Sequence, residues 1–194
     1  MKALRLRNIN KPFFNLRDLE RVLNVLPTSA KVIASRYVRA GLLIRLKRDM
    51  YVLAEQWPYF SIEQKFQFAN LIQTPSYISL MTALSYYQIS TQIQRDFIES
   101  IALKRTKQVN IEKTIFHYSK IKSDLYFGFV RQRNFFIAEA EKALLDAFYL
   151  MSLKRYTLDV AAIDFGKFDR QKIASLLTKF PESVKQMAAE HELA

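Results

Sequence analysis

The stretch that decides the fold of the N-terminal part covers residues 27–53 and reads PTSAKVIASRYVRAGLLIRLKRDMYVL. Apolar residues recur in its first half at steps of three and four, the spacing of one face of an α-helix. Gly41 then stands where helices commonly end. Two β-prone runs follow, residues 42–46 and 50–53, with the polar Lys47-Arg48-Asp49 between them. This order predicts a helix followed by a short hairpin.

A second helical pattern precedes this stretch. Asn15 is a favourable N-cap, and leucines and valines follow it at helical spacing until Pro27 ends the pattern. Thr28 or Ser29 is then expected to cap the next helix, which runs to Ala40. Two helices, a glycine and a hairpin in this order are typical of a winged helix-turn-helix, whose second helix enters the major groove of DNA.

The second helix has two distinct faces. The face expected to pack inward consists of Ala30, Ile33, Ala34, Tyr37 and Val38. The opposite face is predicted to contact DNA through Ser29, Lys31, Val32, Ser35, Arg36 and Arg39. The hairpin tip, Lys47 and Arg48, is expected over a phosphate backbone or in the minor groove. Arg17 and Arg21 on the preceding helix are further candidates for phosphate contacts.

The charge is distributed unevenly. The chain of 194 residues has a formal net charge of +12, of which residues 1–55 carry +8, residues 56–135 carry +5 and residues 136–194 carry −1. A basic N-terminal half indicates a polyanionic partner at that end, although a merely solvated surface would look the same. The chain has no cysteine, no signal pattern and no apolar run long enough for a membrane span, so we expect a cytoplasmic protein.

The rest of the chain predicts a larger mixed domain. Helical patterns cover residues 61–73, 80–87 and 139–151, and two more lie in the tail. Between residues 97 and 138, β-branched and aromatic residues alternate in part, as they do in strands. We therefore predict an α+β protein with a winged helix-turn-helix domain at residues 1–56 and an α+β domain at residues 57–194.

Several segments resemble the AbiEi family of abortive-infection antitoxins. The N-terminal ones are FNLRDL (14–19), YVRAGLL (37–43) and RDMYVL (48–53), and the later ones are PSYISL (75–80), ALSYY (83–87) and IAEAEKALLD (137–146). The later segments are the more specific, since winged-helix patterns are generic. The chain departs from the family at Ala140, where proline is usual, and at Asp49, where glycine is usual in the wing tip.

The resemblance implies a transcriptional repressor that is also the antitoxin of a toxin–antitoxin operon. Its winged helix would bind repeats of double-stranded DNA in its own promoter, and its C-terminal domain would neutralise a nucleotidyltransferase toxin, with direct contact left open. The residues by themselves suggest a plainer role for the EKALLD segment. Lys142 and Asp146 are four apart on a helix and can pair, and Glu141 lies near the helix start, where the helix dipole favours a carboxylate.

Enzyme signatures are missing from the sequence. The three glycines are isolated, so no phosphate-binding glycine-rich loop is present, and no Gly-Ser pair typical of nucleotidyltransferases occurs. The two histidines, His117 and His191, are far apart in the chain, so a metal site is not indicated. We expect no catalytic residue, no metal ligand and no cofactor.

Two other functions fit the same sequence. One is a protein–protein adaptor whose winged helix is structural. The other is an RNA-binding module, because the middle region combines basic and aromatic residues that could stack on bases, namely Lys104, Arg105, Lys107, Tyr118, Lys120 and Lys122.

Overall fold

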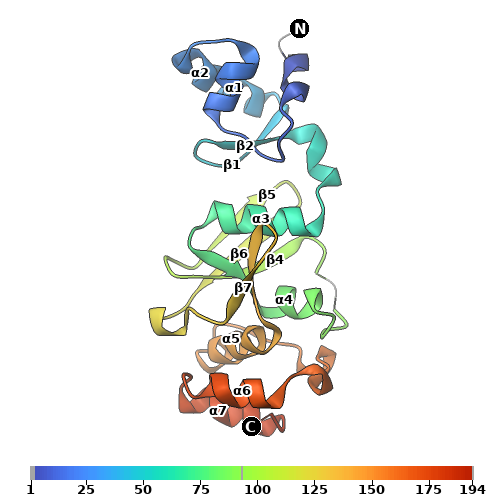
Figure 1. The fold of residues 1–194 in the computed structure, drawn as a ribbon, viewed down its shortest axis with the longest axis vertical. Coiled ribbons are helices and arrows are strands. Elements are labelled where there is room, and N and C mark those ends of the chain that lie inside the picture. Colours follow the sequence, from blue (N-terminus) through green and yellow to red (C-terminus); the bar gives the residue numbers. More distant parts are fainter. Residues whose placement is uncertain (1–2, 93, 194) are drawn as a thin grey trace. The chain divides into compact units, whose positions relative to one another are not determined.

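A computed structural model describes residues 3–92 and 94–193 (Figure 1). The chain divides into two compact units, Met1–Phe68 and Ala69–Ala194. The α+β class expected from the sequence is confirmed, because helices and two β-sheets are both present. The functional domain boundary expected after residue 56 stays a prediction.

The N-terminal unit is a small helical bundle with a two-stranded sheet. Its elements are the 3-10 helix η1 (Ala3–Asn8), α1 (Leu16–Leu23), α2 (Pro27–Arg39), β1 (Leu43–Lys47), β2 (Met50–Leu53), η2 (Ala54–Tyr59) and the first part of α3 (Ile62–Ile72). The apolar faces of η1, α1, α2, β1 and β2 meet in one core, which includes Leu6, Ile9, Phe14, Leu19, Leu23, Ala34, Leu43, Tyr51 and Leu53.

The ends of the first two helices follow local chemistry. Asn15 caps α1 as expected: its side chain accepts a hydrogen bond from the backbone of Asp18, whose carboxylate accepts one from the backbone of Asn15. The cap predicted for α2 is wrong, because the N-cap is Leu26 and neither Thr28 nor Ser29. Proline at the first helical position starts the helix instead, since its fixed φ suits a helix and it needs no donor there.

The C-terminal unit is built on a mixed six-stranded sheet. The strand order is β5-β6-β4-β3-β8-β7. The strands are β3 (Ser76–Ile78), β4 (Phe97–Ala102), β5 (Lys107–Ile111), β6 (Thr114–Lys120), β7 (Phe129–Gln132) and β8 (Phe135–Ala138). Two neighbouring pairs, β4 with β6 and β3 with β8, are parallel, and the other neighbours are antiparallel.

Helices cover this sheet and extend beyond it. They are α4 (Leu80–Tyr86), α5 (Ala140–Ser152), α6 (Arg170–Leu177) and α7 (Glu182–Glu190), with short 3-10 turns η3 (Ser123–Leu125), η4 (Val160–Ala162) and η5 (Phe165–Lys167). Figure 1 shows α5 beneath the sheet and α6 and α7 beyond α5. Ten consecutive residues of α5, Glu141 to Leu150, are buried, so this helix is the centre of the unit.

Candidate nucleic-acid interface

Helix α2 has the two faces that the sequence predicts. Ala30 and Ala34 are fully buried, and Ile33, Tyr37 and Val38 pack partly buried against the core. The opposite face is exposed along the whole helix and consists of Ser29, Lys31, Val32, Ser35, Arg36 and Arg39. The side chains proposed for DNA contact therefore all point away from the core of their unit.

The wing is a short twisted hairpin. Strands β1 and β2 pair antiparallel, with Ile44 opposite Val52, and their register shifts between Arg45 and Lys47. Phe14 adds a bridge to the outer side of β2, because its backbone exchanges two hydrogen bonds of 2.9 Å with that of Tyr51. Strand β2 is thus paired on both sides, by β1 and by Phe14.

The wing turn is tied to the start of α1. Asp49 has a φ of 56°, the left-handed conformation that glycine would adopt more easily. Its carboxylate accepts a hydrogen bond of 2.8 Å from the backbone N–H of Leu16, the first residue of α1. A carboxylate there also satisfies a donor that the helix leaves unpaired. The aspartate that replaces the usual wing glycine thus keeps the turn and adds a contact.

A hollow of about 720 Å³ opens between α2 and the wing. Its polar lining consists of Lys31, Ser35, Arg39, Arg45, Arg48 and Asp49. Four of these six side chains are cationic, so the concave surface attracts phosphate groups. Ser29, Val32 and Arg36 lie on the exposed face of α2 but do not line the hollow.

Arg45 was missed by the sequence argument. It lies in β1 between the buried Ile44 and Leu46, and it is exposed. Its Nε donates a hydrogen bond of 3.2 Å to the backbone oxygen of Lys47, which orients the guanidinium along the hairpin. The alternation of burial along a strand was the signal that could have identified it.

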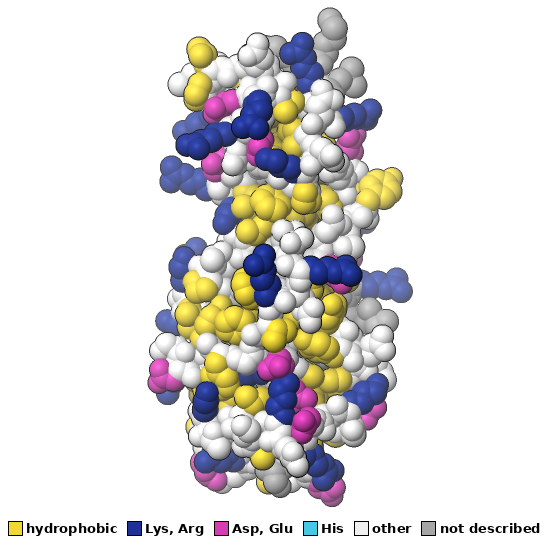
Figure 2. All heavy atoms as spheres, in the orientation of Figure 1, with side chains coloured by type: hydrophobic (Ala, Val, Ile, Leu, Met, Phe, Trp, Pro, Cys, Tyr) yellow, Lys and Arg dark blue, Asp and Glu magenta, His cyan; other side chains and the backbone are white. Residues whose placement is uncertain are grey.

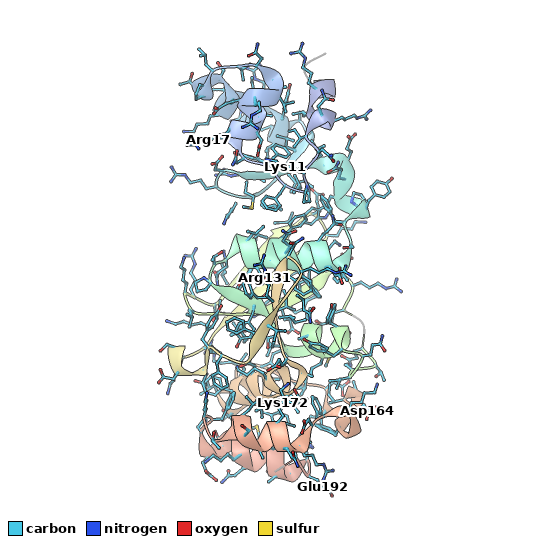
Figure 3. The ribbon with its side chains drawn as sticks, in the orientation of Figure 1. Lys11, Arg17, Arg131, Asp164, Lys172 and Glu192 are labelled. Carbon is cyan, nitrogen blue, oxygen red and sulfur yellow. The ribbon has the colours of Figure 1, made fainter. Side chains whose placement is uncertain are left out.

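The arginines of α1 lie outside the hollow. Arg17 and Arg21 are both exposed, and Figure 3 labels Arg17. Beside them, Lys11 Nζ lies 2.6 Å from Asp18 Oδ1. Partial burial opposes ionisation of Asp18, but the hydrogen bonds from Lys11 and from the backbone of Asn15 lower its pKa overall. Lys11 is therefore engaged with Asp18, whereas Arg17 extends from the helix surface.

The C-terminal unit contains a buried polar cluster. Lys142 Nζ and Asp146 Oδ1, both on α5, form a salt bridge with no exposed side-chain surface, so the expected pairing is confirmed. Tyr77 OH lies 3.0 Å from both Lys142 Nζ and Asp146 Oδ2, and Ser79 Oγ donates to Asp146 Oδ2 over 2.9 Å. Two sequence segments that resemble the AbiEi family therefore meet in one network.

Burial acts on the charges of this cluster. It lowers the pKa of Lys142 and raises the pKa of Asp146 and of Tyr77. Ser79 occupies the N-cap position of α4, but its hydroxyl bonds to Asp146 and makes no capping hydrogen bond to the helix. Since Lys142 and Asp146 are fully buried, the cluster joins β3 to α5 and offers no surface for a ligand.

Gly128 presses against this cluster. Its φ is +68°, and a Cβ placed there would lie 2.9 Å from Lys142 Cγ. The rings of Phe127 and Phe180 cover Lys142, whose Nζ lies 5.0 Å and 5.3 Å from their centroids. The lysine is therefore enclosed by a backbone and two aromatic rings.

The carboxylates at the start of α5 meet a lysine from α6. Lys172 Nζ, labelled in Figure 3, lies 3.0 Å from an oxygen of Glu139 and from one of Glu141. Glu141 also accepts a hydrogen bond of 3.3 Å from the backbone of Asp169. These contacts hold α6 on α5, so Glu141 does more than neutralise the start of its helix.

A second buried carboxylate, Glu99, lies in β4. Its side chain accepts a hydrogen bond of 3.2 Å from Tyr156 OH, and its backbone N–H donates to Thr82 Oγ1 over 2.9 Å. Burial raises the pKa of Glu99 to about 7, against the opposing effect of its hydrogen bonds.

Tyr118, proposed as a base-stacking residue, is fully buried. Its hydroxyl donates a hydrogen bond of 2.7 Å to the backbone oxygen of Ala69. The part of the RNA-binding hypothesis that uses Tyr118 is therefore wrong. His117 stacks on Phe97 and His191 on Phe165. Within the described ranges, no three His, Cys, Asp or Glu side chains gather as a metal site, and no helix is long and apolar enough to cross a membrane.

Comparison with known proteins identifies the N-terminal part. Residues 1–54 match the family described as "Transcriptional regulator, AbiEi antitoxin". The resemblance to AbiEi regulators is thereby confirmed. The match covers the winged helix with its hollow, and the family's description is that of a transcriptional regulator and antitoxin.

The fold as a whole also has a relative. The Rv2827c protein from Mycobacterium tuberculosis, known from a crystal structure, superimposes with a TM-score of 0.61 over 97% of this chain and 73% of its own, at 12% sequence identity. At this identity the likeness concerns the fold alone. No curated protein matches this chain.

Proposed function

We propose that this chain is a sequence-specific transcriptional repressor that acts as the antitoxin of a toxin–antitoxin operon. In this proposal, residues 1–56 bind repeats of double-stranded DNA in the chain's own promoter. Residues 57–194 neutralise a nucleotidyltransferase toxin. The AbiEi match over residues 1–54 supports the regulatory half directly, because it covers the winged helix.

One observation carries the DNA-binding half: α2 and the wing present cationic side chains around a single hollow. Lys31 and Arg39 enter it from α2, and Arg45 and Arg48 from the wing. A helix in the major groove with an adjacent β-ribbon on the backbone needs this arrangement. In this arrangement the hollow binds the sugar-phosphate backbone of one DNA strand, and the outer face of α2 contacts the bases.

The roles of individual residues follow from their positions. Arg36 is exposed on α2 and lies off the hollow, so it is the residue placed to pair with a guanine edge. Val32 offers an apolar contact to a thymine methyl, and Ser29 and Ser35 can bond to phosphate or base edges. Lys47, Arg48, Arg17 and Arg21 serve phosphates in this proposal.

The direct test is binding of the full chain to duplex DNA from upstream of its gene, measured by fluorescence anisotropy beside a scrambled duplex. We expect strong preference for the upstream duplex and a steep loss of affinity as salt rises. Arg36→Ala should weaken the specific complex about tenfold or more and reduce the preference. Arg48→Ala should weaken both duplexes alike and flatten the salt dependence.

The matched control is Arg170→Ala, an exposed arginine at the start of α6 in the other unit, which should leave both affinities unchanged. Equal binding of the two duplexes, or none, would reject the repressor and leave the adaptor function. The antitoxin half is tested by co-expression with the protein encoded by the neighbouring gene, where growth should recover only when the full chain is present.

A further inference from the structure

The C-terminal unit carries a second basic region that the winged helix does not use. Residues 103–133 contain eight Lys and Arg against two Asp and Glu. The remaining residues of this unit, 69–102 and 134–194, have a net charge of −2. The positive charge is therefore concentrated on β5, β6, β7 and the segments that connect them.

Part of this charge surrounds a hollow at one end of the strands. The parallel strands β4 and β6 end together, with Ala102 opposite Lys120. Beyond them lies a hollow of about 860 Å³, whose lining includes Lys120, Lys122 and Arg155 together with Ser123 and Asp124. Within residues 3–92 and 94–193, no salt bridge engages the three cations.

A group of aromatic rings lies at the β7 edge of the same sheet, two of them half-buried and one exposed. Phe129 on β7 stacks with Tyr77, with 4.6 Å between their ring centroids, and Ala138 lies between them on β8. Because Tyr77 bonds to Asp146 of α5, Phe129 also lies on the face of the sheet that α5 covers. Phe136 is two residues before Ala138 on β8 and lies on that side too, 6.0 Å from Phe129, with 42% of its surface exposed. Tyr126 extends the group, 5.0 Å from Phe129.

An arginine lies beside these rings. Arg131, labelled in Figure 3, is paired with Phe136 across β7 and β8 and is exposed. Its Nε donates a hydrogen bond of 3.3 Å to the backbone oxygen of Arg133, so the guanidinium is held near the sheet. Figure 2 shows hydrophobic and basic side chains together on the near face of this unit.

One stretch of chain joins the hollow to the rings. Residues 121–128 leave β6 after Lys120 and reach β7 at Phe129; because β6 and β7 run in the same direction, this stretch crosses the face of the sheet that α5 covers, where Phe127 and Gly128 lie against Lys142. Lys122 on this stretch lines the hollow, and Tyr126 on the same stretch contacts the ring group. Cations and aromatic rings thus follow one another along a single path.

We propose that this path binds a single-stranded polynucleotide, with phosphates in the hollow of Lys120, Lys122 and Arg155 and unpaired bases on Phe136 and Tyr126 beside Arg131. A positively charged groove followed by aromatic rings is the arrangement that binds single strands, since every base has a face that can stack. A duplex keeps its bases stacked inside and cannot use the rings. The site is separate from the winged helix, so it does not depend on the proposed promoter binding.

The test uses the full chain and fluorescein-labelled oligo(U) and oligo(dT) of about 12 nucleotides, a length within the range of known single-strand sites. We expect both the Phe136→Ala and the Arg131→Ala variant to raise Kd about tenfold, because each removes a stacking partner. The Phe136→Trp variant should retain binding. Replacing Lys120 and Lys122 by glutamine should raise Kd and flatten its salt dependence.

Two control variants remove a cation and an aromatic ring that lie away from the proposed site. Lys113→Gln removes an exposed cation from the turn between β5 and β6, and Tyr59→Ala removes a ring that is 86% exposed in the N-terminal unit. Neither should change the Kd of the oligonucleotides. Thermal unfolding of each variant checks that the fold is intact. Tighter binding of oligo(U) than of oligo(dT) identifies RNA, and equal binding identifies single strands of either kind.

Three results would overturn the proposal. The first is no binding of either oligonucleotide at low salt, or a Kd that Phe136→Ala does not change. The second is loss of oligonucleotide binding in the Arg36→Ala, Arg39→Ala double variant, which would assign it to the winged helix. The third is equal displacement by polyglutamate of the same charge, which would indicate a docking surface for acidic proteins. Failure here leaves duplex binding untouched, so the two proposals fail independently.

Discussion

Asp49 shows how one residue fixes the geometry of the wing. It takes a left-handed backbone conformation and at the same time accepts the hydrogen bond of the first N–H of α1. Glycine could provide only the first of these two contributions, because it has no side chain. The departure from the usual wing glycine therefore strengthens the contact between wing and helix.

Substitutions of Asp49 should separate the two contributions. Asp49→Gly removes the hydrogen bond alone and should lower the free energy of unfolding by about 1 kcal/mol. Asp49→Ala removes the bond and adds left-handed strain, and should lower it by about 2–3 kcal/mol. Urea unfolding of both variants gives the comparison. Equal stability of the two would show that the backbone conformation carries no penalty.

Glu99 should make the stability of the fold depend on pH. Burial raises its pKa from 4.5 to about 7, so the folded chain binds this proton more tightly than the unfolded chain. The contribution of this proton to the free energy of unfolding is fully present below pH 4.5. That contribution falls by about 3 kcal/mol as pH rises to 7. Glu99→Gln should remove this fall. Urea unfolding of both proteins across this pH range measures the difference, and parallel curves would contradict the assignment.

At the scale of elements, α5 is held to β3 by polar contacts as well as by packing. Lys142 and Asp146 are fully buried, and both bond to Tyr77. A buried pair contributes little by itself because desolvation opposes it, but loss of one partner leaves a buried charge. The network therefore matters most for how these two elements fit together.

Single and double substitutions should show this dependence. Lys142→Met should lower the free energy of unfolding by about 3–5 kcal/mol, because Asp146 is left without its cation. Adding Asp146→Asn should recover part of the loss, since the amide is neutral and still bonds to Tyr77 and Ser79. A double-mutant cycle by urea unfolding gives the coupling. Additive losses would mean that the pair is not coupled.

Helices and strands whose apolar residues recur with a clear period could be predicted from the sequence. Helix α5 begins within one residue of its expected start, because its apolar spacing is strong. The edge strand β5 was not foreseen, since its sequence KQVNI is mostly polar and its partner β6 stabilises it. Leu125 was expected in a strand over residues 125–130 but lies in the 3-10 turn η3, because it belongs to the crossing between β6 and β7.

At the scale of the whole molecule, sequence alone identified the outward face of α2 but not what surrounds it. The hollow depends on how the wing folds beside the helix, and that brings in Arg45 from a strand. The buried network depends on contacts between residues 65 or more positions apart, such as Lys142 with Tyr77. Local patterns carry no information about such contacts.

If the two proposed activities reside in separate units, they should be separable by mutation. The Arg36→Ala, Arg39→Ala double variant should lose repression of a promoter reporter, because the outer face of α2 is lost. It should still protect cells against the neighbouring gene's product. Reporter output and growth are measured in the same strain, with Arg170→Ala as control. Loss of both by a stably folded variant would show that protection depends on DNA binding.

Gly128 limits which sequences this fold accepts. Because a methyl group there would collide with the stem of Lys142, the smallest residue at one position permits a long side chain at another, fourteen residues later. A variant in which residue 142 is shortened to alanine leaves room for a larger residue 128, although the left-handed backbone would still favour glycine or asparagine. Which residues are tolerated at position 128 therefore depends on the residue at position 142. Two substitutions that are each harmful alone can be compatible in combination.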